Sequence, residues 1–208
     1  MKFVVISDTH GLHENLQGLP SGDVIIHAGD FCHFGGAESR THFLSWYADL
    51  NYRYKILISG NHDFYAAENP NSFLDELPTG VTYLNDSGTE IAGLKCWGSP
   101  VQPDLIGWAF GRARGEQMKA HWDLIPLDTD ILITHTPPRG ILDQSSSGKV
   151  LGCEELLKKM VWIKPRIHIF GHIHASYGQQ RIDDTLYING SNMNSAKGLV
   201  NPPFTFEL

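Results

Sequence analysis

Aspartates, histidines and one asparagine gather in five short polar clusters, each directly after a short apolar run. In chain order the clusters hold Asp8 with His10, Asp30, Asn61 with His62, His135, and His172 with His174. Mixed imidazole and carboxylate ligands suit borderline divalent ions such as Mn, Fe and Zn, whereas Mg and Ca prefer oxygen shells. Two such ions, roughly 3.5–4 Å apart, can clamp a phosphoryl oxygen and generate a hydroxide near neutral pH. The residue types therefore predict a metal site that acts on phosphate esters.

Each cluster is weak evidence alone, because a lone histidine after a strand is more often a surface or core residue than a ligand. The five clusters together are stronger evidence, since Gly60-Asn61-His62-Asp63 and Gly171-His172-Ile173-His174 each follow a four-residue run in which three residues are apolar, at 56–59 and 167–170. A carboxylate can bridge two ions, and a carboxamide oxygen can serve as a neutral ligand. A His-x-His on a tight turn can send two imidazoles to two different ions.

The elements that must position these clusters are short strands buried on both faces. Continuous apolar runs bounded by Gly or Pro predict such strands, and helical spacing of apolar side chains predicts helices between them. We expect strands at 3–6, 24–27, 56–59, 131–134 and 167–170, further strands at 81–84, 90–97, 181–188 and 204–208, and helices at 37–50, 115–124 and 154–163. Residues 83–100 read as a meander with its turn at 85–88. Two central sheets with helices outside satisfy this order, and ligand sites form at the carboxyl ends of such strands.

The order Asp-x-His, Gly-Asp, Gly-Asn-His-Asp, His, Gly-His-x-His resembles that of the calcineurin-like metallophosphoesterase superfamily, from Asp8 to His174. The resemblance implies an α/β (α+β) fold, a four-layer αββα sandwich of two mixed β-sheets flanked by helices, with two divalent metal ions. It implies that one ion is held by Asp8, His10, Asp30 and His174, and the other by Asp30, Asn61, His135 and His172. Asp30 would bridge the two ions. His62 would be a catalytic residue that binds no metal and touches the scissile phosphate or the leaving group.

A narrower resemblance is carried by Trp97-Gly98-Ser99-Pro100 and Gly107-Trp108-Ala109-Phe110. These segments resemble the metallophosphoesterase-domain-containing proteins, a branch related to class III cyclic nucleotide phosphodiesterases. It implies hydrolysis of a phosphodiester, cyclic nucleotides included, by attack of a metal-bound hydroxide. The alternatives are a phosphomonoesterase, a protein serine/threonine phosphatase, and a catalytically silent protein-binding scaffold of the same fold. A scaffold should lack ligands, and here every ligand position carries a coordinating side chain.

Three further residues are candidates for substrate contact or for support of the ligands. Asp63 is expected to orient the backbone or His62, because catalytic and ligating imidazoles need a partner. His33 lies on the loop that should rim the site. Arg139 follows the fourth cluster and suits a phosphate oxygen, although a solvated loop arginine is an equally good interpretation. His27 and His168 fall inside strand runs and are expected to be packed or hydrogen-bonded.

Composition limits the class of partner. The chain has 208 residues, which favours one domain over 1–208, and a net charge of −7 that argues against binding a nucleic acid polymer. A small phosphorylated substrate is therefore expected. Three widely spaced cysteines form no CxxC pair, which favours reduced thiols and a cytoplasmic protein. The apolar run at the N-terminus is too short for a signal peptide or a membrane span. The oligomeric state, monomer or dimer, is left open.

Overall fold

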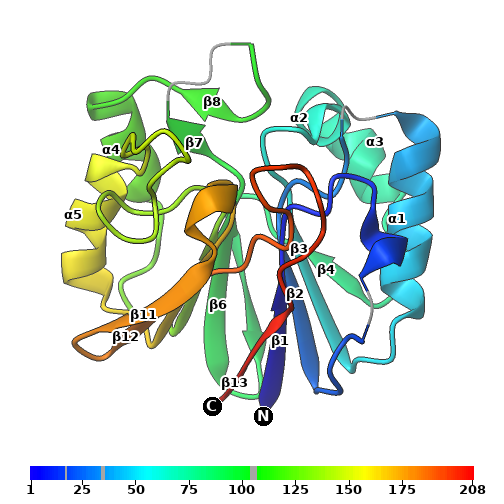
Figure 1. Cartoon of the computed structure of the whole chain (residues 1–208). Helices are drawn as coiled ribbons and strands as arrows, with labels where there is room; N and C mark the ends of the chain where they lie inside the picture. The colour runs from blue at the N-terminus through cyan, green and yellow to red at the C-terminus, as the bar shows by residue number, and fades with distance from the viewer. Residues whose placement is uncertain (17, 34–35, 104–106) are drawn as a thin grey trace.

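Two β-sheets stack face to face in the computed structural model of the chain, and helices cover the outer face of each sheet (Figure 1). The structure describes residues 1–16, 18–33, 36–103 and 107–208. Both chain ends lie side by side at the bottom of the view in Figure 1. The short strands β7 (Gln102–Pro103) and β8 (Gly111–Arg112) lie at the opposite end.

The first sheet carries three of the five polar clusters after its parallel strands. Its order is β13 (Phe204–Glu207), β1 (Lys2–Ile6), β2 (Val24–Ala28), β3 (Tyr54–Ile58) and β4 (Val81–Tyr83). β1 to β4 run parallel, and only β13 pairs antiparallel, with β1. Because the strands run parallel, the loops that follow β1, β2 and β3 all leave from the same edge of the sheet.

The second sheet carries the other two clusters. Its order is β11 (Gly178–Ile182), β12 (Thr185–Asn189), β10 (Ile167–Phe170), β9 (Ile131–Thr134), β6 (Leu94–Ser99) and β5 (Ser87–Ile91). The four central strands are parallel, and antiparallel strands close both sides. The loops that follow β9 and β10 therefore leave from one edge, as in the first sheet.

Side-chain alternation along the strands builds the layers. In β1, Phe3 and Val5 face the second sheet, whereas Val4 and Ile6 face the helices. The helices over the first sheet are α1 (Ala37–Asp49), α2 (Phe64–Glu68) and α3 (Pro70–Asp75), and those over the second are α4 (Glu116–Trp122) and α5 (Glu154–Ile163). Two single turns of 3-10 helix are also present, η1 (His13–Asn15) after β1 and η2 (His174–Ser176) after β10. The predicted four-layer sandwich is confirmed.

Two of the predicted elements are wrong in detail. The predicted strand at 90–97 is a hairpin of β5 and β6 that turns at Ala92-Gly93, and Ser87 and Gly88 lie inside β5 rather than in a turn. Ala92 and Gly93 have φ of +50° and +83°, the left-handed pair that a two-residue hairpin requires. The predicted strand at 181–188 is likewise the β11–β12 hairpin. Within the described ranges, no helix has the length and apolarity that a membrane crossing requires.

Candidate metal centre

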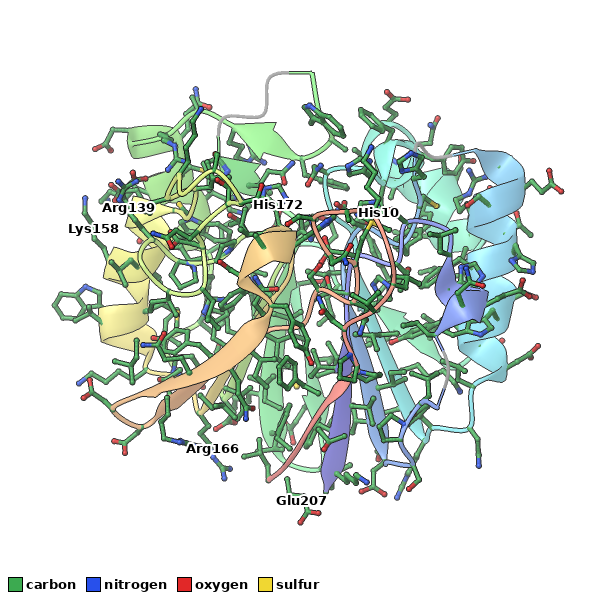
Figure 2. All side chains as sticks on the ribbon, viewed as in Figure 1. His10, Arg139, Lys158, Arg166, His172 and Glu207 are labelled. Atoms are coloured by element: carbon green, nitrogen blue, oxygen red, sulfur yellow. The ribbon has the colours of Figure 1, made fainter. Side chains whose placement is uncertain are left out.

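The five polar clusters meet in space at the carboxyl ends of β1, β2, β3, β9 and β10. Figure 2 shows His10, from the first sheet, and His172, from the second, close to the seam between the two sheets. The loops are also joined through the backbone, since the Asp8 N–H donates to the Gly29 carbonyl at 3.0 Å and the His10 N–H to the Asp30 carbonyl at 3.0 Å. The fold thus brings residues from Asp8 to His174 into one site.

Asp8, His10 and His174 form the first group of side chains. The His174 Nε2 lies 3.3 Å from Asp8 Oδ1 and 3.2 Å from His10 Nε2. His10 Nε2 lies 4.0 Å from Asp8 Oδ1. The two oxygens of Asp8 also accept the His172 N–H at 3.1 and 3.0 Å, which fixes the carboxylate between the two sheets. The group has one carboxylate and two imidazoles around a common point.

Asp30, His135 and His172 form the second group, and Asn61 adjoins it. The His135 Nδ1–H donates to the Ala28 carbonyl at 2.9 Å, so its Nε2 faces Asp30 Oδ2 at 3.3 Å and Asn61 Oδ1 at 3.1 Å. Asp30 also reaches the first group, because the same Oδ2 lies 3.8 Å from His10 Nε2. Its other oxygen accepts the His62 N–H at 2.8 Å. Asp30 therefore stands between both groups with its carboxylate orientation fixed.

Backbone strain is concentrated at these same positions. Four of the candidate ligands have left-handed backbone conformations, with φ of +54° at Asp8, +45° at His10, +55° at Asp30 and +68° at His172. Residues other than glycine rarely adopt this region, and such outliers cluster at functional sites where the surrounding structure imposes them.

Two glycines are required by close approach at the site. A Cβ at Gly60 would lie 2.4 Å from Asp30 Oδ1 and 2.6 Å from His135 Cε1. A Cβ at Gly171 would lie 2.2 Å from Asp8 Oδ2. A methyl group at either position would displace a carboxylate, which explains why glycine precedes Asn61 and His172 in the sequence.

The two central carboxylates are ionised although they are buried. Burial alone would raise the pKa of Asp8, but the hydrogen bond and charge of His174 outweigh it and hold the pKa well below its ordinary value. Burial also acts to raise the pKa of Asp30, and the neighbouring His135 reverses it in the same way. Among the residues that the structure describes, all ion-pair partners of these two carboxylates are histidines. Two buried negative charges that are paired in this part of the chain with imidazoles alone favour a bound cation.

The pKa values of the four imidazoles shift in two directions. Burial lowers the pKa of His10 to about 4 and that of His172 to about 3, so both rings are neutral and offer a lone pair. Burial also acts to lower the pKa of His135, but the charge and hydrogen bond of Asp30 raise it to about 9. The hydrogen bond and charge of Asp8 likewise outweigh burial at His174 and raise its pKa. A metal ion that bound His135 would displace the proton that this ring carries.

His62 lies beside the first group. Its ring centroid is 4.6 Å from that of His10 and 4.5 Å from that of Trp108. The His33 carbonyl accepts the His62 Nδ1–H at 2.6 Å, and the His33 ring stacks on the His62 ring with centroids 5.8 Å apart. His33, predicted at the rim, is exposed there. His10, His33 and His62 also place one ring nitrogen each within 4.8 Å of the others.

Asp63 supports the loops rather than the ring of His62. Its Oδ2 accepts the Asp30 N–H at 3.0 Å and the Gly60 N–H at 2.7 Å, and its Oδ1 accepts the Cys32 N–H at 2.9 Å. Burial and the charge of Asp30 raise the pKa of Asp63, which the N–H donors of Cys32 and Gly60 oppose. The sequence left open whether Asp63 orients the backbone or the ring of His62, and these contacts favour the backbone.

Arg139 does not join the cluster. Its guanidinium pairs with Glu154 at 2.9 Å at the start of α5, and Figure 2 shows it on the α5 side, away from His10 and His172. Glu154 also pairs with Arg114, so the two arginines share one carboxylate.

Sequence reasoning also missed Asn192. Its side-chain Oδ1 accepts the Ser7 N–H at 3.0 Å, and its backbone N–H donates to the Ser7 carbonyl at 2.9 Å. Nothing in its sequence neighbourhood signals this contact.

The donor sets fit divalent ions. Each group offers two imidazoles and one carboxylate, the mixture that Mn, Fe and Zn accept, and Asn61 adds a carboxamide oxygen beside the second group. His/Asp groups at the strand ends of an αββα sandwich define a metal-dependent phosphoesterase.

Comparison with known proteins gives the same class. The profile of the family described as "Calcineurin-like phosphoesterase" matches residues 1–176, so the chain belongs to this family of phosphoesterase hydrolases. It is 38% identical over its whole length to Metallophosphoesterase domain-containing protein 1 of Homo sapiens, of which it covers 71%. It is 38% identical over 99% of its length to UPF0046 protein K07C11.7 of Caenorhabditis elegans, of which it covers 74%. These relatives confirm the predicted branch of metallophosphoesterase-domain-containing proteins.

A solved structure shares the fold. The structure of TT1561 of Thermus thermophilus superimposes with a TM-score of 0.62 over 99% of this chain and 98% of that chain, at 13% sequence identity. The likeness supports the sandwich architecture alone.

Proposed function

We propose that the protein hydrolyses phosphodiesters, cyclic nucleotides among them, with two divalent ions of Mn, Fe or Zn. The observation that carries the proposal is the position of Asp30, whose Oδ2 lies 3.3 Å from His135 and 3.8 Å from His10. One carboxylate between two ligand groups is the arrangement that a bridged pair of ions needs. When bound, the ions would supply Lewis acidity to the phosphoryl oxygens and lower the pKa of a coordinated water.

The residues divide between the two ions as the family resemblance implies. Asp8, His10, Asp30 and His174 would hold the first ion, and Asp30, Asn61, His135 and His172 the second. The contacts support this division, because His135 lies next to Asp30 and Asn61, whereas His174 lies next to Asp8 and His10. His135 would bind through Nε2, since its Nδ1–H is held by the Ala28 carbonyl.

We assign His62 the transfer of a proton to the leaving oxygen. Its Nδ1–H donates to the His33 carbonyl, which can only accept, so Nε2 is the ring nitrogen that would serve the substrate. His62 therefore acts as a general acid only when Nε2 also carries a proton. The stacked ring of His33 and the edge-on ring of Trp108 fix its plane. General acid catalysis of this kind is typically worth about 10²–10⁴-fold in rate.

A cavity lined in part by Trp108, whose ring contacts His62, supports a diester rather than a monoester. It has a volume of about 340 Å³, and Trp108, Phe110 and Arg112 contribute to its lining. Trp108 also contacts His62, and the neighbouring Ala109 N–H donates to the Asn61 carbonyl at 3.2 Å, which ties this loop to the centre. A diester carries one negative charge fewer than a monoester dianion, so its second substituent needs contacts of its own. An aromatic wall and a polar rim would supply them.

The test is the ratio of kcat/KM for bis-p-nitrophenyl phosphate to that for p-nitrophenyl phosphate, at one pH and with Mn²⁺. We expect a ratio above one in the wild type and a lower ratio in Trp108→Ala. The exposed Trp162→Ala on α5 is the matched control and should leave the ratio unchanged. A wild-type ratio well below one would instead identify a phosphomonoesterase or a protein phosphatase.

A further inference from the structure

Each sheet contains one fully buried histidine that is not among the proposed ligands. His27 lies on β2 and His168 on β10, and both have 0% exposure. β2, which carries His27, pairs in parallel with β1, and β10, which carries His168, pairs in parallel with β9. Proposed ligands follow the carboxyl ends of β1 and β9. Each hydrogen-bonds a threonine that is a chain neighbour of a proposed ligand. The same arrangement therefore occurs twice, once in each half of the site.

In the first sheet, His27 connects the loops of the first ion. The Gly29 N–H donates to His27 Nδ1 at 3.3 Å, so the ring proton is on Nε2. That Nε2–H donates to the Thr9 hydroxyl at 3.0 Å. Thr9 is the residue between Asp8 and His10, and Gly29 directly precedes Asp30. One imidazole thus spans the turns that carry three proposed ligands.

In the second sheet, His168 does the same for His135. The Thr134 hydroxyl donates its proton to the Thr136 carbonyl at 2.7 Å, so it must accept the His168 Nε2–H at 2.8 Å. Thr134 and Thr136 flank His135 on both sides. His168 Nδ1 is buried and has no hydrogen-bond partner among the described residues, as expected for the unprotonated nitrogen. Each ring is therefore a neutral donor with a single orientation, and burial lowers both pKa values to about 3.

We propose that His27 and His168 are positioning residues that set the metal affinity of the two halves of the site through Thr9 and Thr134. The proposal rests on the proposed function, since it assumes that the flanked residues bind metal. The left-handed conformations of Asp8, His10 and Asp30 need such support, because the backbone would otherwise relax away from them. Partners of this kind behind a metal ligand typically contribute about 10–100-fold in metal affinity.

The experiment is calorimetric titration of the metal-free full-length chain with Mn²⁺. His27→Met and His168→Met replace the imidazole with an apolar side chain of similar size and so remove the Nε2–H donor. His27→Gln and His168→Gln are the matched variants, because glutamine carries an amide N–H at a reach similar to that of Nε2. Thermal unfolding of each metal-free variant measures the purely structural effect separately.

We expect each Met variant to weaken one of the two Mn²⁺ binding steps by about 10–100-fold, and each Gln variant to restore most of the affinity. Thr134→Val combined with His168→Met should weaken Mn²⁺ binding no more than the worse single change, because both changes remove the same hydrogen bond between Thr134 and His168. Thr9→Val combined with His168→Met should be additive, since the two changes lie in different halves.

Met variants that unfold at lower temperature but bind Mn²⁺ with wild-type affinity would overturn the positioning role. Gln variants that bind as weakly as the Met variants would overturn the hydrogen bond as its cause. A wild-type protein that takes up no Mn²⁺ is a different result, which overturns the proposed function and the positioning roles with it.

Discussion

Asp30→Asn removes the charge between the two ligand groups and leaves the shape of the side chain unchanged. In the metal-free wild type, Asp30 Oδ2 lies 3.3 Å from His135 Nε2, and both side chains are almost fully buried. A unit charge at this distance is worth roughly 5 kcal/mol at an effective dielectric constant of about 20. One pKa unit corresponds to about 1.4 kcal/mol. The substitution should therefore lower the pKa of His135 from about 9 to roughly 5.

NMR titration of the metal-free protein measures this pKa directly, with the His135 resonance assigned through His135→Gln. Asn61→Ala is the control, because it removes a neutral group 3.1 Å from the same nitrogen and should leave the pKa of His135 near 9. If the pKa of His135 is the same in Asp30→Asn as in the wild type, the Asp30 carboxylate does not stabilise the protonated ring. The inferred position of Asp30 between the two ligand groups would then be wrong.

Four further outcomes are expected. Mn²⁺ uptake at pH 7 should release protons, because His135 has a pKa of about 9 and must lose its proton to bind; calorimetry in two buffers of different ionisation enthalpy counts them. His62→Ala should lower kcat by about 10²–10⁴-fold with both ions retained, more for an alkoxide leaving group than for p-nitrophenolate; loss of an ion would make His62 a ligand. His168 has a pKa of about 3 when folded and about 6.5 when unfolded, so the unfolded state binds more protons between these values and stability falls as the pH falls. His168→Gln should flatten that slope by about 1.4 kcal/mol per pH unit in urea unfolding with a chelator, and an unchanged slope would mean that His168 is protonated in the fold. Arg139→Ala should keep wild-type kcat/KM on a diester, since its partner is Glu154; a loss above tenfold would return it to the site.

Strand ends were the most predictable part of the molecule. The mostly apolar runs before Asp8, Asp30, Asn61, His135 and His172 each form a parallel strand, because a short run rich in apolar residues has few alternatives to burial on both faces. Parallel strands send their carboxyl ends to one edge, so the strand prediction brings the clusters together within each sheet. The stacking of the two sheets then brings the two sets of clusters to one site. The structure brings all seven proposed ligands together.

Features that depend on contacts distant in sequence could not be predicted. Arg139 suited a phosphate oxygen and a solvated loop position equally well in the sequence, but its partner is Glu154, fifteen residues further along the chain. The turn expected at 85–88 is present only in part: Asp86 is left-handed with φ of +49°, but Ser87 and Gly88 belong to β5, and the β5–β6 hairpin turns at Ala92-Gly93. The Nδ1 partner of His62 is a main-chain carbonyl, a contact that no side-chain pattern records.

Titration of the metal-free protein with Mn²⁺, followed through hydrolysis of bis-p-nitrophenyl phosphate, tests the central claim most directly. A two-ion site bridged by Asp30 predicts that activity rises until two equivalents of Mn²⁺ are bound, and that Asp30→Asn remains almost inactive at the same loading. Activity that is complete at one equivalent, or that does not respond to Mn²⁺ while the ion binds, would contradict it.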